Sequence, residues 1–462
     1  RKATDNNAGD GTNCGRDAER CTRRPACAEG NSRPTGSRRG ASMNDGRNVV
    51  LVTVDSLRRD SVGFLSESAP QTPVIDDRAD GAAIASTTTT PSTHTRASVP
   101  AILSSQYAHN FFNHFFGDTE IPHLGSILGE HGYETAGIHS NPLLSSFFGY
   151  DEGFDTFYDS MNEVTLPSER LTTVYSKIKR LLRRHPYEPA DEITDRALEW
   201  LDTASEPYFL WVHYMDPHGP YRLNPERGYL DKLASERLWY RAVRSPETVT
   251  DDETDRLLGG YRNEVKFTDG EIGRLLSAVE NDTAVVLTGD HGEEFGEHGG
   301  YTHHKKLYDE IVQVPFVLDL PTETEPVDGP YSSLDIVPTL CSYLDIETDA
   351  EFVGDDLLDE TRADRECVLT ETNTDEAVTV GVRSPTHKLI AKGDEREFYD
   401  LQADPDEQSD LSGREGEAFD RFESILAQFR ASTEIGYSGA RDGYGDIDPH
   451  TEDRLRDLGY VD

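Results

Sequence analysis

One stretch of sequence indicates the fold first, and it reads AVVLTGDHGEEFGEHG at residues 284–299. Its first four residues are apolar, and two of them are β-branched, which predicts a short buried strand. Asp290 and His291 follow where the strand pattern ends. Open α/β sheets place their reactive groups at the carboxyl ends of parallel strands, and a carboxylate beside an imidazole can bind a divalent cation. Taken alone, such a pair is more often part of a solvated turn.

A second stretch repeats the arrangement, NVVLVTVDSLRRD at residues 48–60. A continuous β-branched run is typical of a central parallel strand that is buried on both faces. Asp55 stands at its carboxyl end, so we expect it in the same crevice as Asp290 and His291. The alternative is that Asp55 caps the next helix, which is compatible with metal binding.

A third stretch joins hydroxyl side chains to a helical pattern, TTTTPSTHTRASVPAILSS at residues 87–105. A Thr at a helix N-terminus lies near exposed N–H groups and the positive end of the helix dipole. A metal ion on its oxygen would favour the alkoxide and make it a nucleophile at neutral pH. Capping of the helix is the simpler function for such a residue.

Together these stretches resemble the alkaline phosphatase superfamily in its sulfatase-like branch. Other motifs follow in the family's order: HYMDPHGPY at 213–221, LYDE at 307–310, SLDIVPTL at 333–340 and FYDLQADPDE at 398–407. The resemblance implies an α/β fold, a doubly wound, mostly parallel sheet in an α/β/α sandwich. It also implies a small C-terminal subdomain built on an antiparallel sheet.

The chain departs from the family at the nucleophile. Sulfatases of this family convert a Cys or Ser within Cys/Ser-x-Pro-x-Arg to formylglycine. Aligning the helix that ends at Ser105 places this nucleophile on Thr95, the Pro on Ala97 and the Arg on Val99. Thr cannot become formylglycine, and in this respect the chain resembles superfamily branches in which an unmodified Thr attacks phosphorus.

The resemblance assigns one divalent metal ion to Asp55, Asp290 and His291, with Thr95 as nucleophile and possible fourth ligand. Such a donor set suits Mn²⁺, Zn²⁺ or Mg²⁺. Ca²⁺ fits less well, because Ser56 stands where sulfatases usually have a second Asp.

The remaining site residues also come from the resemblance. The expected catalytic residues besides Thr95 are His218 and His213, as general acid or oxyanion donor, although a packed core residue is an equal alternative for His213. We expect Asp216 to orient His218. The expected substrate-binding residues are Arg96, Asn141 and either His303 or His304. For Arg96, beside the nucleophile, a surface salt bridge is an equal alternative to an anion clamp.

Composition restricts the partners. The 462 residues include 87 acidic and 45 basic ones, for a net charge of −42. An acidic surface suits a cytoplasm of molar salt, because salt screens the self-repulsion, and this favours a haloarchaeal origin and a cytoplasmic location. It argues against nucleic acid as a partner, since phosphate contacts need basic surface. No apolar run is long enough to predict a transmembrane segment. The oligomeric state stays open.

The chain divides into three parts by composition. Residues 1–42 are rich in Arg, Gly and Ser and lack apolar periodicity, so we expect a disordered, non-native extension before Met43. We expect a catalytic domain at 43–362 and a small α+β subdomain at 363–462, with a helix near 419–429.

The sequence predicts a metal-dependent hydrolase or transferase that acts on an anionic phosphate or sulfate ester through Thr95, with phosphate esters favoured. One alternative is a sulfatase that works without formylglycine. Another is a non-catalytic binding protein that has kept the fold.

Overall fold

The structure is a computed structural model, and part of the chain is described in it. The described residues are 47–69, 71–112, 116–160, 187–223, 229–303, 305–321, 327, 329–361, 365–373, 377–414 and 416–433. The expected extension at 1–42 and His304 lie outside these ranges.

An eight-stranded sheet forms the centre of the molecule, in the order β10-β2-β9-β6-β1-β5-β3-β4. Its strands are β1 (Val49–Val54), β2 (Ile84–Thr89), β3 (Glu134–His139), β4 (Thr156–Tyr158), β5 (Tyr208–Tyr214), β6 (Ala284–Gly289), β9 (Gln313–Asp319) and β10 (Tyr331–Ser332). β9 is antiparallel to both of its neighbours, and all other neighbouring pairs are parallel. The expectation of a mostly parallel sheet is therefore confirmed.

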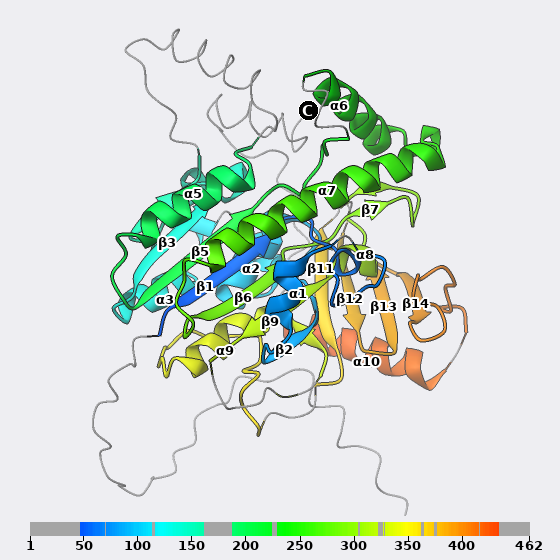
Figure 1. Ribbon diagram of the computed structural model, residues 1–462. Helices are drawn as coiled ribbons and strands as arrows, with labels where there is room; N and C mark the ends of the chain where they lie inside the picture. The colour runs from blue at the N-terminus through cyan, green and yellow to red at the C-terminus, as the bar shows by residue number, and fades with distance from the viewer. Residues whose placement is uncertain are drawn as a thin grey trace, which may run out of the picture.

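Helices cover both faces of this sheet (Figure 1). One face carries α2 (Thr95–Ser104), α3 (Leu124–Glu130) and α9 (Ile336–Tyr343). The other carries α1 (Pro73–Ala79), α5 (Ala190–Leu201), α6 (Tyr229–Arg244) and α7 (Asp251–Leu276). Alternate residues of a strand point to opposite faces. Accordingly, Leu51 of β1 packs in the first layer and Val52 in the second, and both are fully buried.

A second, four-stranded antiparallel sheet follows near the C-terminus (Figure 1). Its strands are β11 (Val368–Asn373), β12 (Val378–Arg383), β13 (His387–Lys392) and β14 (Glu395–Asp400). Helix α10 (Glu417–Ser432) packs on it through Phe422 and Phe429. Both the small sheet and the helix near 419–429 are as expected. We retain a boundary near residue 362 as a proposal, since it falls between α9 and β11.

Two short elements connect the sheets to the site. The strands β7 (Glu294–Phe295) and β8 (Tyr301–Thr302) form a two-stranded ribbon, and α8 (Asp309–Val312) precedes β9.

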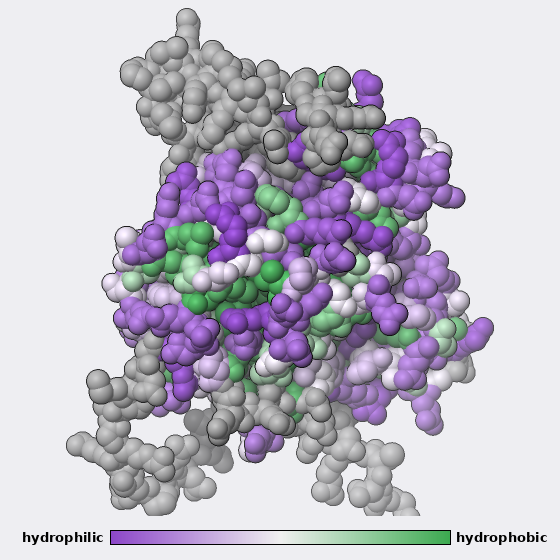
Figure 2. All heavy atoms as spheres, viewed as in Figure 1, coloured by the Kyte–Doolittle hydropathy of each residue, from purple (hydrophilic) through white to green (hydrophobic). Residues whose placement is uncertain are grey.

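Most of the face seen in Figure 2 is hydrophilic, and apolar residues gather in smaller areas. Among the described residues, no helix is long and apolar enough to cross a membrane.

Candidate active site

Two central strands end at one edge of the large sheet. β1 and β6 are parallel neighbours, and Val54 is paired with Gly289. The residues that follow, Asp55 and Asp290, therefore leave the sheet side by side at its carboxyl edge. Reactive groups collect at this edge in open α/β sheets, as the sequence predicted.

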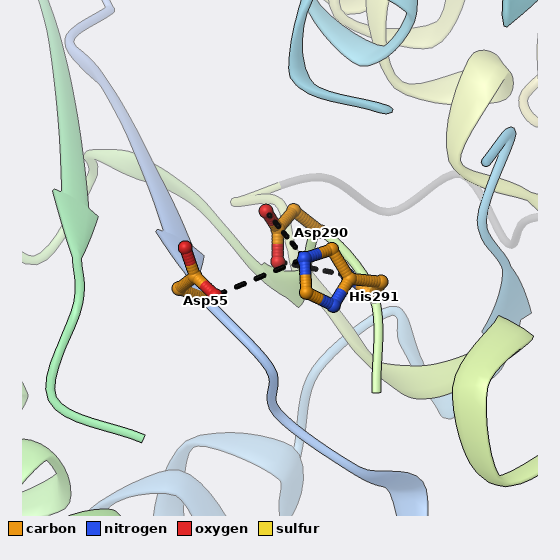
Figure 3. Close-up of side chains that lie close together, drawn as sticks. All are labelled: Asp55, Asp290 and His291. Atoms are coloured by element: carbon orange, nitrogen blue, oxygen red, sulfur yellow. Dashed lines mark hydrogen bonds and ion pairs between the residues drawn. The ribbon is translucent and has the colours of Figure 1, made fainter. Parts of the chain in front are cut away.

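Asp55, Asp290 and His291 form a compact, fully buried group (Figure 3). Each offers one ligand atom, and these atoms lie within 4.8 Å of one another. Nε2 of His291 is 3.8 Å from Oδ1 of Asp55 and 3.5 Å from Oδ2 of Asp290. Nδ1 of His291 lies 2.9 Å from the carbonyl oxygen of Gly292, which can only accept. Nδ1 therefore carries the proton, and the Nε2 lone pair faces the carboxylates.

The group fits a divalent cation. Oδ2 of Asp290 is buried without a hydrogen-bond partner among the described residues. Burial, followed by the nearby Asp55 carboxylate, raises the pKa of Asp290 to about 8. Two buried carboxylates repel each other, and a divalent cation between them would neutralise both. Two oxygens and one nitrogen are donors that Mn²⁺, Zn²⁺ and Mg²⁺ accept.

Thr95 points its hydroxyl into this group. It is the first residue of α2 and is nearly fully buried. Its Oγ1 lies 3.2 Å from Oδ2 of Asp55 and 3.2 Å from Nε2 of His291. The exposed N–H groups of a helix N-terminus favour negative charge on such an oxygen. Thr95, the residue that the alignment of this helix with the family motif selects, thus lies beside the proposed metal ligands.

Neighbouring side chains hold the two carboxylates. Oγ of Ser56 donates to Oδ1 of Asp55 at 2.9 Å, and its backbone N–H donates to Oδ1 of Asp290 at 3.2 Å. Nδ2 of Asn141 donates to Oδ2 of Asp55 at 3.2 Å. Asn141 therefore lies in the group, on the same carboxylate oxygen that Thr95 reaches.

Three histidines surround the group. Nε2 of His213 lies 3.6 Å from Oδ2 of Asp55. The ring of His303 lies 4.3 Å, centre to centre, from that of His291 and 5.2 Å from that of His218. Of the two candidate substrate-binding histidines, His303 thus lies beside the group of proposed metal ligands. His304 is outside the described residues.

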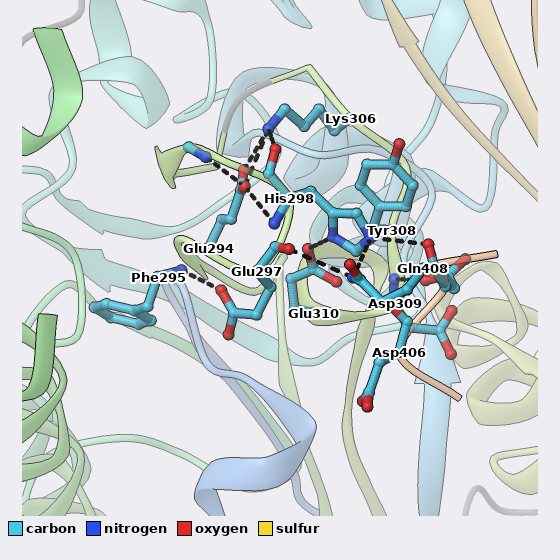
Figure 4. A network of polar contacts seen from close by, with 12 residues as sticks. Glu294, Phe295, Glu297, His298, Lys306, Tyr308, Asp309, Glu310, Asp406 and Gln408 are labelled. Carbon is cyan, nitrogen blue, oxygen red and sulfur yellow. Dashed lines mark hydrogen bonds and ion pairs between the residues drawn. The ribbon is translucent and has the colours of Figure 1, made fainter. Parts of the chain in front are cut away.

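Polar contacts hold the loop that carries His303 (Figure 4). Nζ of Lys306 donates to Glu294 at 2.9 Å and to the carbonyl oxygen of His298 at 2.8 Å. Nδ1 of His298 lies 2.6 Å from Oε1 of Glu310, at the start of α8. Lys306, in the loop that carries His303, is thus bound to β7 and to the turn between β7 and β8, and the same turn is bound to α8.

The ring of His218 has a different partner from the predicted one. Nδ1 of His218 bonds to the carbonyl oxygen of Gly219 at 2.7 Å, so this carbonyl and not Asp216 holds the ring. Asp216 is fully buried, and burial raises its pKa well above the ordinary value. Arg96 is half-buried beside His94. Burial chiefly, and the Arg96 charge among smaller causes, lowers the pKa of His94 to about 3. A role for Arg96 as an anion clamp stays a prediction.

Sequence reasoning did not select Glu293 as a site residue. Its buried carboxylate accepts a hydrogen bond from the Tyr221 hydroxyl at 2.7 Å. Its other oxygen lies 3.4 Å from Nδ1 of His303. Glu293 belongs to the quoted motif, three residues after Asp290, so its position could have been noticed. Its contacts with Tyr221 and His303 could not be predicted, because they form only in the fold.

Comparison with known proteins identifies the family. A family model named Sulfatase matches residues 47–346, which include both proposed carboxylate ligands, His291 and Thr95. The chain belongs to the sulfatase family. It is 26% identical to an uncharacterized sulfatase, YidJ, of Escherichia coli over 67% of this chain and 70% of that protein. Other curated relatives are matched over 32–62% of their length.

Solved structures of other enzymes share the fold. A phosphonate monoester hydrolase of Agrobacterium radiobacter superposes with a TM-score of 0.66 at 18% identity, covering 85% of this chain and 99% of that one. An enzyme solved with its substrate D-glucosamine-2-N,6-O-disulfate superposes with a TM-score of 0.66 at 17% identity, covering 86% and 100%. The protein is an ester hydrolase of a family whose members bind a divalent metal ion.

Proposed function

We propose that the protein cleaves an anionic ester by attack of the Thr95 hydroxyl, with one divalent ion held by Asp55, Asp290 and His291. One observation carries the proposal. Oγ1 of Thr95 lies 3.2 Å from an oxygen of Asp55 and 3.2 Å from Nε2 of His291, at the N-terminus of α2. When bound there, the ion supplies positive charge that favours the alkoxide and offsets the charge of the substrate.

Each reacting atom has a partner in the proposed reaction. The proton of the Thr95 hydroxyl would leave to water, since the bound ion favours the alkoxide. The Thr95 oxygen forms a bond to phosphorus or sulfur, and the bond from that atom to the ester oxygen breaks. His218, when protonated, delivers a proton to the leaving oxygen, and His213 donates a hydrogen bond to a non-bridging oxygen. Water then attacks the Thr95 ester in a hydrolase, whereas an alcohol does so in a transferase. Arg96 and His303 are proposed to contact the anion.

We favour phosphate esters over sulfate esters. The reason is chemical: an unmodified Thr hydroxyl stands at the position where sulfatases of the family carry formylglycine. A second candidate is a sulfatase that works without formylglycine. It is supported by the relatives, since an E. coli relative is named as a sulfatase and another structure is described with a sulfated sugar as its substrate.

A substrate panel tests the proposal. Purified protein would be loaded with Mn²⁺, Zn²⁺ or Mg²⁺ in high salt and assayed with matched aryl phosphate monoesters, diesters, phosphonates and sulfates. We expect turnover of a phosphorus ester, and a loss of roughly a thousandfold or more in Thr95→Ala.

Thr93→Ala is the matched control. Thr93 is also a buried Thr close to the start of α2, but its hydroxyl bonds to that of Thr372 at 2.8 Å. Turnover of the aryl sulfate alone would favour the second candidate. Equal losses in the two variants would contradict a special role for Thr95.

A further inference from the structure

A hydroxyl group from β1 lies between two side chains of β5, close to the group of proposed metal ligands. In the parallel pair, Thr53 stands opposite His213, and Leu51 stands opposite Trp211. Oγ1 of Thr53 lies 3.0 Å from Nε1 of Trp211 and 2.9 Å from Nδ1 of His213. All three residues are fully buried. Buried polar groups are nearly always hydrogen-bonded, so each hydrogen in this contact should have an acceptor.

The donors and acceptors can be counted. An indole N–H only donates, so Trp211 uses a lone pair of the Thr53 oxygen. Thr53 has one hydroxyl hydrogen, and Trp211 and His213 are its only hydrogen-bond partners among the described residues. If Nδ1 of His213 donated to Thr53, the hydroxyl hydrogen would be buried without an acceptor, which is costly. Thr53 therefore donates to Nδ1, and neutral His213 carries its proton on Nε2.

This proton faces the reaction centre. Nε2 of His213 lies 3.6 Å from Oδ2 of Asp55 and has no hydrogen-bond partner among the described residues. His291 is arranged in the opposite way, since its Nδ1 donates to the Gly292 carbonyl and its Nε2 presents a lone pair. The two rings thus present different groups to one site: His291 offers a ligand atom, and His213 offers a hydrogen-bond donor.

We propose that Thr53 is a positioning residue of the active site, which with Trp211 fixes His213 in the Nε2–H tautomer, so that His213 donates to an oxygen of the bound ester. The use of that donor rests on the proposed function, whereas the tautomer itself does not. In this arrangement His213 is neither a metal ligand nor a base, because both roles need a lone pair on Nε2. The role of core residue, an alternative from the sequence, does not explain why Nε2 is directed at Asp55.

The tautomer can be observed without activity. Metal-free protein labelled with ¹⁵N-histidine would be studied by long-range ¹H–¹⁵N correlation, with the His213 signals assigned by their loss in His213→Gln. We expect a protonated Nε2 and an unprotonated Nδ1 in the wild type and in Thr53→Ser, which keeps the hydroxyl. Thr53→Val should lose this single pattern. A proton on Nδ1 of wild-type His213 would overturn the proposal.

Thr288→Val is the matched control. Thr288 is a fully buried Thr of β6 that stands opposite Thr53 in the register, and its hydroxyl bonds only to the Gly289 carbonyl oxygen among the described residues. It should leave the His213 signals unchanged. In the assay, Thr53→Val should lower kcat roughly 10–100-fold with metal content retained, and Thr53→Ser should restore most of it. Unchanged signals and unchanged kcat in Thr53→Val would overturn the role of Thr53. If no ester is turned over, the proposed function fails, and the spectra still decide the tautomer.

Discussion

The two carboxylate oxygens of Asp290 have different surroundings. One carboxylate oxygen accepts the backbone N–H groups of Ser56 at 3.2 Å and His291 at 2.8 Å, which fixes its direction. The other oxygen is buried and has no hydrogen-bond partner among the described residues, so it is available to a cation. The backbone hydrogen bonds to one oxygen of Asp290 therefore fix the direction of the other oxygen.

Asp290→Asn should abolish metal binding and turnover. The amide keeps the size of the side chain but removes its negative charge, and a metal ligand that is lost costs both affinity and nucleophile activation. We expect bound metal to fall from about one ion per chain to near zero, as measured by elemental analysis of desalted protein.

Asp319→Asn is the control for that variant. Asp319 stands opposite Val285 near the other end of β6 and pairs with Arg78 at 2.9 Å. It should retain its metal. An Asp290→Asn protein that still binds one ion tightly would show that the ligands are wrongly assigned.

At the scale of the element, α8 joins the two sheets. Its first residue, Asp309, accepts from Nζ of Lys388 on β13 at 2.9 Å and from Arg383 on β12 at 2.8 Å. Lys388 is fully buried and also pairs with Glu407 at 2.9 Å. Since α8 leads directly into β9, these ion pairs tie the small sheet to the large one close to the loop of His303.

Lys388→Met should destabilise the fold. Removing one partner leaves two buried carboxylates without their shared cation, and breaking a buried ion pair typically costs about 3–5 kcal/mol. Denaturant unfolding in molar KCl would measure the loss. Lys232→Met is the control, because its pair with Glu236 at 3.8 Å is partly exposed and should contribute less than about 1 kcal/mol. Equal stabilities of the two variants would contradict a structural role for Lys388.

The elements differ in how far sequence could predict them. β1 and β6 were predictable because each is a continuous apolar run, which is typical of a parallel strand buried on both faces. The position of Thr95 at the start of α2 was predictable from the alignment of that helix with the family motif. The partners of His218 and His303 were not, because Gly219 acts through its backbone and Glu293 through a loop contact. Such contacts depend on the conformations of loops. Hydrophobic periodicity predicts helices and strands but not loop conformations.

The whole molecule carries a net charge of −42, and much of the surface in Figure 2 is hydrophilic. Like charges on a compact protein repel one another over a Debye length of about 10 Å at 0.1 M salt and about 3 Å at 1 M. We propose that the protein is adapted to high salt, as its composition predicted. A divalent ion held by Asp55, Asp290 and His291 would then supply positive charge where the anionic ester must bind.

The melting temperature should therefore rise between 0.1 M and 2 M KCl, because screening removes repulsion from the folded state. Differential scanning calorimetry would measure it, with sucrose of equal osmolality as the control for crowding and excluded-solvent effects. A melting temperature that is flat or falls with KCl would contradict adaptation to high salt.

Trapping of the covalent intermediate would test whether Thr95 attacks the ester. The metal-loaded enzyme would be quenched with acid during turnover of an aryl phosphorus ester, digested, and sequenced by mass spectrometry. We predict one phosphoryl or phosphonyl group on Thr95, and none in Thr95→Ala. A label on Ser92, Thr93 or Ser98 would contradict the assignment, as would rapid turnover with no label on the protein.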